Sequence, residues 1–305
     1  MLSLLQDAGW EYLGIFGEFA TIGALGFRYG VLAGADRLGE PIAENVTRRA
    51  ARTAALIGLA GAVVATLMYV HGQAERAADH GQTVAQALAT PQGLVPLVLV
   101  LVSALAFALA SIGSAIGWPL AAIATLAFVL RSLASGKWQS MVNPFHILGG
   151  SLWIGTLAVF VVAGLSAALH TSMPADQRGP IVSRWVNAFS PLALGSASLL
   201  VLTGVITAVR HLKYVAALWT TSYGFALDAK LCAVACVVAL GAWNWKRVKP
   251  ICHTEPGARQ LQRSARAELA MAAVVLAITG ILLSLPSPKR PQTNTEPNTA
   301  QLPTQ

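Results

Sequence analysis

Eight apolar segments, each about as long as a bilayer core requires, constrain this chain more than any other feature. They lie at residues 11–33, 53–71, 94–111, 116–131, 145–168, 191–210, 223–245 and 267–285. A helix needs about 20 predominantly apolar residues to span a bilayer. Because lipid offers the backbone no hydrogen-bond partners, such segments cross as helices. The predicted fold class is an all-α polytopic membrane protein, with eight transmembrane helices forming one domain over residues 1–285.

The composition agrees with a bilayer as the surroundings. Of the 305 residues, 55% are hydrophobic and 11% are charged, and the mean hydropathy is +0.60. Soluble domains average about 25% charged residues. The composition therefore excludes most soluble enzymes and nucleic-acid-binding modules, and no nucleic-acid partner is expected. Small residues such as Gly17, Gly149 and Gly155 interrupt the segments, and we interpret them as positions of close helix packing.

The distribution of Lys and Arg predicts the orientation. The loops after the first, fifth and seventh segments hold 12 of these residues, and the opposite side holds 7. The richer side of a membrane protein faces the cytoplasm, so both termini are predicted to be external. Residues 286–305, rich in Pro, Thr, Asn and Gln, are predicted to be a disordered periplasmic tail.

Three histidines lie at the predicted external ends of three different segments. They are His71, His146 and His211. Imidazole is the commonest protein ligand for transition metals, and thioether sulfur beside it favours Cu(I). Met68 shares a helix face with His71. We therefore predict a metal site made by these four residues, and the secondary candidates near it are Met141 and His80. The alternative is that these histidines only lie in the headgroup region, as amphipathic side chains often do.

Cysteines and charges inside the segments offer candidates for an ion path. Cys232 and Cys236 follow Asp228 at four-residue spacing, so the three share one helix face. The cysteines would carry Cu(I) inward or would simply pack as small buried residues. Glu18 and Lys230 are also intramembrane charges, which are costly without a partner or a polar cavity. Glu18 and Lys230 lie at matched depth, so we predict that they pair and, with Asp228, form a polar path or gate.

The second half of the chain carries a series of distinctive motifs: HILGGSLWIGTLAVF, RWVNAFSPLALGSASLLVLTGVITAV, TSYGFALDAKLC, WNWKRVKP and RSARAELA, in this order. Through these motifs, residues 146–286 resemble the copper-resistance protein D (CopD) family. This resemblance implies a multi-pass protein of the bacterial inner membrane that handles copper, with a separate periplasmic copper carrier of the CopC type as a partner. Family-motif positions that match include Trp153, Asn244 and Glu268.

Together these features predict copper transport or copper homeostasis. Copper would be collected at the periplasmic side and passed through the helix bundle. The chain has neither a Walker A loop nor an Asp-Lys-Thr-Gly phosphorylation motif, so it is not expected to be an ATP-driven pump or another enzyme. Two alternatives remain open: a membrane cytochrome in which external histidines ligate haem, and a copper sensor or docking subunit that binds copper without transporting it.

Overall fold

The computed structural model describes residues 2–39, 42–135, 138–170, 173–212 and 216–285. Within these ranges every regular element is a helix, and no strand occurs. At a few helical positions, Met141 and His211 among them, only the backbone is described. The predicted tail, residues 286–305, lies outside the described residues.

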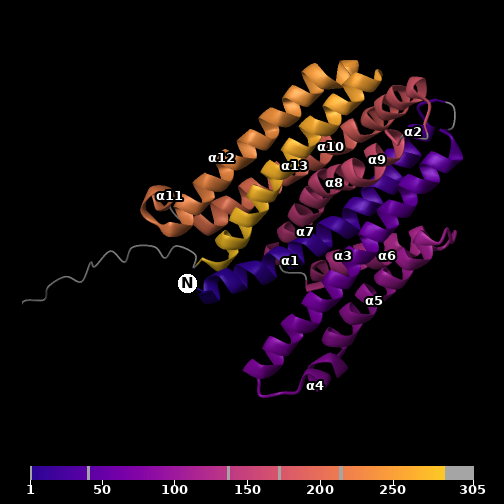
Figure 1. The fold of residues 1–305 in the computed structure, drawn as a ribbon. Helices are drawn as coiled ribbons and strands as arrows, with labels where there is room; N and C mark the ends of the chain where they lie inside the picture. The colour runs from indigo at the N-terminus through magenta and orange to yellow at the C-terminus, as the bar shows by residue number, and fades with distance from the viewer. Residues whose placement is uncertain (1, 40–41, 136–137, 171–172, 213–215, 286–305) are drawn as a thin grey trace, which may run out of the picture.

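The first half of the chain forms four long antiparallel helical rods (Figure 1). The first rod comprises α1 (Leu2–Leu25), η1 (Gly26–Leu32) and α2 (Ala33–Asp36), and the second is α3 (Glu44–Asp79). The short α4 (Val84–Ala89) leads into α5 (Pro91–Ser111), and α6 (Gly117–Leu130) continues into η2 (Arg131–Ser135). α3 packs against both α1 and α5, and α5 packs against α6. Gly113 has a φ of 87°, a conformation that glycine adopts without strain, and it makes the turn between α5 and α6.

The second half adds three more long rods and one segmented rod. The segmented rod consists of α7 (Trp138–Gly150), η3 (Ser151–Gly155), α8 (Thr156–Val159), η4 (Phe160–Leu165) and α9 (Ser166–Ala168). After it come α10 (Ala175–Leu212), α11 (Ala217–Thr220), α12 (Ser222–Trp243), η5 (Asn244–Val248), η6 (Lys249–Ile251) and α13 (Glu255–Ser284). α10 packs against α7, α12 packs against α13, and α1 contacts α3, η3 and α13 (Figure 1).

Seven helices of the described residues are long and apolar enough to cross a membrane. They are Glu44–Asp79, Pro91–Ser111, Gly117–Ala134, Val142–Ala168, Ala175–Arg210, Ser222–Ile251 and Glu255–Leu282. The fold is therefore that of an all-α, multi-pass membrane protein. The predicted span at residues 11–33 is helical, but it is not among the seven, and Glu18 and Arg28 reduce its apolar character. Eight spans and external termini remain predictions.

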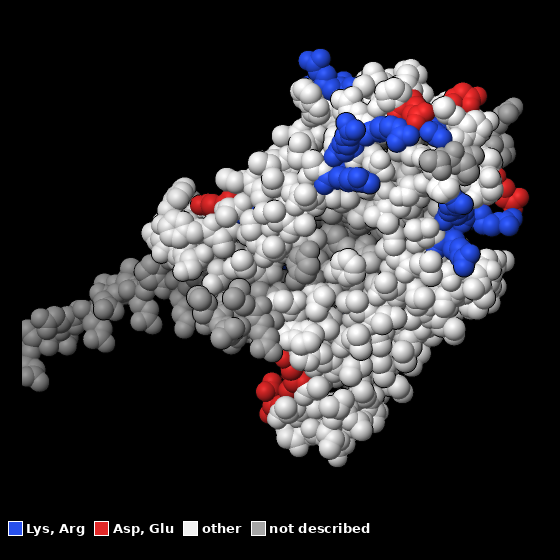
Figure 2. Space-filling view, viewed as in Figure 1, with Lys and Arg blue, Asp and Glu red and all other residues white. Residues whose placement is uncertain are grey.

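Basic side chains gather at one end of the bundle. In the view of Figure 2, Lys and Arg lie at the end where α2 and the start of α13 are found. We call this the arginine-rich end; it includes Arg37, Arg48, Arg184, Arg247 and Arg259. The uneven distribution of Lys and Arg between the two ends of the bundle is what is expected if the arginine-rich end is the cytoplasmic one.

Glycines allow the two halves of the bundle to meet at backbone distance. A Cβ atom on Gly155 of η3 would collide with the Phe19 carbonyl oxygen of α1 and would lie 3.3 Å from the Gly23 Cα atom. On the opposite side of α1, a Cβ atom on Gly17 would lie 3.0 Å from the Gly61 carbonyl oxygen of α3. α1 is thus held between α3 and η3 by small residues, as membrane helices often are.

Candidate functional site

The side chain of His146 lies at the contact between α7 and α10. Its Nδ1 atom is 3.0 Å from the Thr203 hydroxyl oxygen. That hydroxyl donates its own proton to the Leu199 carbonyl, at 2.7 Å. With that proton directed to Leu199, the Thr203 oxygen accepts from Nδ1–H of His146, which is the tautomer that this hydrogen-bond pattern favours. This tautomer leaves the Nε2 lone pair of a neutral imidazole free to bind a metal ion.

Small residues of α10 and α7 make room for this ring. A Cβ atom on Gly204 would lie 3.2 Å from His146 Cε1, and a Cβ atom on Gly149 would lie 3.0 Å from the Ser196 carbonyl oxygen. The helices run antiparallel, with His146 opposite Thr203 and Gly149 close to Ser196. These glycines therefore let the two helices pack closely and leave space for the half-buried imidazole.

Lys230 of α12 lies near His146, close enough for the two charges to interact. Its side chain is half-buried, and within the described part of the chain it takes part in no ion pair. A cation bound at His146 Nε2 would therefore have a positive charge as its neighbour. Asp228 is also half-buried on the same helix, two residues away.

His71, the second predicted ligand, belongs to the other half of the bundle. Its ring lies against Trp10 of α1, with ring centroids 4.4 Å apart, and its Nε2 atom is 3.3 Å from the Glu75 carboxylate. Met68 is half-buried one turn earlier in α3, and His80 is exposed at the end of that helix. α3 packs against α1 and α5, whereas His146 lies between α7 and α10. His71 and His146 therefore lie among different helices, in different halves of the bundle.

His211 and Met141 have side chains outside the described residues, but their helices show their depth. His211 follows Thr203 by eight residues of α10, which is about 12 Å at 1.5 Å per residue. Met141 precedes His146 in α7, which runs antiparallel to α10. Both therefore lie farther from the arginine-rich end than His146 does. Among the described residues, no group of three or more His, Cys, Asp or Glu side chains is placed to hold a metal ion.

The cysteines of α12 lie on the side of the helix that faces away from the bundle. Cys232 and Cys236 are both exposed. The side that packs against α13 carries Ala233 and Val237 in contact with Ala272 and Val275. In a bilayer, the two thiols would therefore face lipid rather than the interior of the bundle.

Glu18 lies in the first half, near Arg131 of η2 rather than Lys230. Arg131 is close enough to Glu18 for their charges to interact, and its guanidinium lies 3.8 Å from the centre of the Phe128 ring. No ion pair joins Glu18 to Lys230, both of which the structure describes. The predicted pair is thus not formed, because matched depth does not fix the direction in which a helix turns its side chains.

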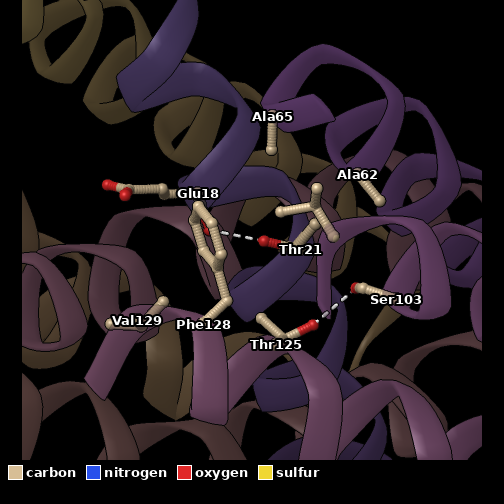
Figure 3. Close-up of a pocket in the computed structure, with 9 residues that line it drawn as sticks. Glu18, Thr21, Ala62, Ala65, Ser103, Thr125, Phe128 and Val129 are labelled. Carbon is tan, nitrogen blue, oxygen red and sulfur yellow. Dashed lines mark hydrogen bonds between the residues drawn. The ribbon is translucent and has the colours of Figure 1, made fainter. Parts of the chain in front are cut away.

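A small cavity of about 20 Å³ lies beside Glu18, among α1, α3, α5 and α6. Figure 3 shows its polar lining: Thr21, whose hydroxyl donates to the Glu18 carbonyl, and the hydroxyls of Ser103 and Thr125, which are 2.8 Å apart. The Glu18 carboxylate points away from these hydroxyls. The cavity has room for one water molecule.

Asn244 and Glu268 form a buried polar pair that our sequence analysis treated only as family positions. Asn244 Nδ2 donates to Glu268 Oε2 at 2.9 Å, and the two residues are 9% and 5% exposed. Both belong to patterns of inward-facing positions that repeat every seven residues, one along α12 into η5 and the other along α13. The α12 pattern is 223, 227, 230, 234, 237, 241 and 244, and the α13 pattern is 261, 265, 268, 272, 275, 279 and 282. This spacing is typical of helices packed along each other, and it is visible in the sequence.

A comparison with known protein families matches the part of the chain that contains Thr203 and the Asn244–Glu268 pair. Residues 183–282 match the family model of Copper resistance protein D. The matched region contains Thr203, Lys230, Asn244 and Glu268, and it confirms the CopD resemblance. Trp153, which precedes the matched region, belongs to the same buried hydrophobic cluster as Ala233 and Val237 within it.

One curated relative also has a name that refers to copper. The chain is 26% identical over 154 residues to the protein named Copper transport protein CutJ from Bacillus subtilis (strain 168). The similarity covers 50% of this chain and 26% of the relative, so the chain spans about a quarter of that protein's length. No solved structure matches this chain.

Proposed function

We propose that this protein is an inner-membrane copper transporter that takes up copper at His146 and passes it through the CopD-like half of the bundle. The proposal is supported by the CopD match and by a relative that is named a copper transport protein. The observation that carries the site is the hydrogen bond between His146 Nδ1 and the Thr203 hydroxyl, which engages one ring nitrogen and leaves Nε2 as the candidate ligand atom. A metal-binding histidine is commonly held through its other ring nitrogen in this way.

The site we propose is a series of positions rather than one compact cluster. His211 and Met141 lie nearer the end of the bundle that is opposite the arginine-rich end, and they would meet the ion first. His146 would receive it at the next level. His71 and Met68 would provide a second binding position, on the first half of the bundle. Cys232 and Cys236 are poorer candidates for the path, since they are exposed on the outer side of α12.

Lys230 and Asp228 would set the electrostatics of the path below His146. A lysine near the ion raises the energy of a cation unless its charge is compensated. We propose that Lys230 acts as the gate, without the Glu18 partner that the sequence suggested. The arginine-rich end would be cytoplasmic, and a separate periplasmic carrier of the CopC type would deliver copper at the opposite end.

The test is copper uptake into sealed proteoliposomes together with copper binding in detergent. We expect His146→Ala to lower copper affinity at least tenfold, and Thr203→Val to lower it about tenfold by removing the acceptor that orients the ring. His253→Ala is the matched control, because His253 is an exposed histidine beside Pro250 near the arginine-rich end. Unchanged affinity in His146→Ala would remove this histidine from the site. A strong Soret absorption band of the purified protein would instead support the cytochrome alternative.

A further inference from the structure

Glu268 is a buried carboxyl that the proposed copper site does not use. It is 5% exposed, and its one hydrogen-bond donor in the described structure is Asn244 Nδ2. Gly241 of α12, one turn before Asn244, lies beside the same carboxyl: a Cβ atom there would be 3.4 Å from Glu268 Oε1. Oε1 thus lies close to the backbone of a packed helix.

Among the described residues, none places a positive charge next to an ionised Glu268. The elements packed against α13 carry titratable groups on α1, α10, α12, η5 and η6, while η4 and α8 carry none. The described groups are Glu18, Asp176, Arg178, Arg184, Arg210, Tyr223, Asp228, Lys230, Cys232, Cys236, Lys246, Arg247 and Lys249, and on α13 itself Glu255, Arg259, Arg263 and Arg266. None of them pairs with Glu268: Lys249 donates to Ser190 at 2.9 Å, and Arg178 pairs with Glu255 at 2.7 Å.

The pair also contains an acceptor without a donor. Asn244 Oδ1 is buried and has no hydrogen-bond partner in the described structure. In the described structure the Asn244 amide N–H is the one donor to the Glu268 carboxyl, and it cannot serve its own Oδ1. Burial of an unpaired carboxylate is far more costly than burial of the neutral acid. A proton on Glu268 removes that charge and adds the donor that this group of oxygens lacks.

The pair lies toward the arginine-rich end of the bundle. Glu268 follows Arg266 by two residues, about 3 Å along α13. Asn244, the first residue of η5, lies 14 residues beyond Lys230 of α12, about 21 Å farther toward that end. His146 and Glu268 are therefore at different levels of the same half of the bundle.

We propose that Glu268 and Asn244 form a proton-binding site at the inner end of the bundle, and that the proton held there is exchanged for the transported cation. The exchange rests on the proposed transport function. The Glu268 O–H bond breaks, the proton passes through the bundle to water at the end opposite the arginine-rich end, and the remaining carboxylate compensates one positive charge of an ion in the bundle. When the ion leaves toward the arginine-rich end, the carboxylate takes a proton from water at that end, and no electron is transferred.

The proton site itself is tested without transport. We expect the infrared spectrum of the lipid-embedded protein at neutral pH to contain the carbonyl band of a protonated carboxylic acid. Glu268→Gln should remove this band, because the amide still accepts from Asn244 but has no acidic proton. Glu18→Gln is the matched control and should keep the band, while Glu268→Asp should shift it. Identical spectra for the wild type and Glu268→Gln would overturn the proton site.

The exchange is tested in proteoliposomes that contain a pH-sensitive dye. Copper entry should drive proton movement in the opposite direction in the wild type. In Glu268→Gln this movement should be lost while copper affinity at the outer end is unchanged. Equal proton movement in both proteins would refute the exchange and leave the transport function standing. A wild type that takes up no copper would refute the transport function, while the infrared band still decides whether Glu268 holds a proton.

Discussion

Replacing Gly155 by alanine tests the closest backbone contact between the two halves of the bundle. The new Cβ atom would collide with the Phe19 carbonyl oxygen and would also press on Gly23. These atoms belong to the backbone of α1 and cannot rotate away as a side chain can. Relief therefore requires α1 and η3 to separate, and separation weakens their packing over several turns.

The magnitude follows from two opposing effects. Adding a methyl group to a tightly packed site costs about 1–3 kcal/mol, and the backbone contact places Gly155 at the upper end of that range. Alanine is a better helix former than glycine by about 1 kcal/mol. The expected net loss is about 2 kcal/mol, which lowers the ratio of folded to unfolded protein about 30-fold.

Unfolding in mixed detergent–lipid micelles, followed by thermal or denaturant titration, measures this loss. Gly195→Ala is the control, since a Cβ atom on Gly195 of α10 meets nothing within 4 Å. It should be neutral or slightly stabilising. The double variant Gly23→Ala with Gly155→Ala should lose less stability than the sum of the singles, because one separation of the helices relieves both contacts. If Gly155→Ala were as stable as Gly195→Ala, the two backbones could not lie in contact as described.

Three further predictions concern the ends of the bundle. Reporter fusions active only on one side of the membrane should label the C-terminus as periplasmic, because we expect the arginine-rich end to face the cytoplasm; a cytoplasmic label would refute this orientation. Burial raises the pKa of the Cys252 thiol, so the folded state should lose stability as the pH rises above the ordinary thiol pKa of about 8.5, where the unfolded chain releases its proton first. Cys252→Ala should flatten that alkaline slope in pH-dependent unfolding, and an unchanged slope would assign it to another group. Arg178→Ala should lower the melting temperature more than Arg259→Ala, since Arg178 joins α10 to Glu255 of α13 while Arg259 pairs within one helix; equal shifts would show that the link between helices contributes nothing.

The buried pair of Asn244 and Glu268 shows what residue spacing alone can predict. Asn244 and Glu268 each occupy one position in a seven-residue pattern of inward-facing residues. The two patterns indicate which face of each helix is packed, and therefore that the polar residues point inward. What the spacing does not give is the register between the helices, which places Asn244 Nδ2 within hydrogen-bond distance of Glu268.

The sequence by itself determined the class of the fold, because a run of apolar residues long enough to cross a bilayer must satisfy its backbone as a helix. It also revealed the CopD-like region, since that resemblance depends on local motifs and their order. Only the tertiary structure decided which polar residues are neighbours. Sequence spacing gives the depth of a residue and its direction relative to its own helix, but not which helix lies on that side. For this reason the predicted pairing of Glu18 with Lys230 is not formed, and His146 is oriented by Thr203, which is 57 residues away in the chain.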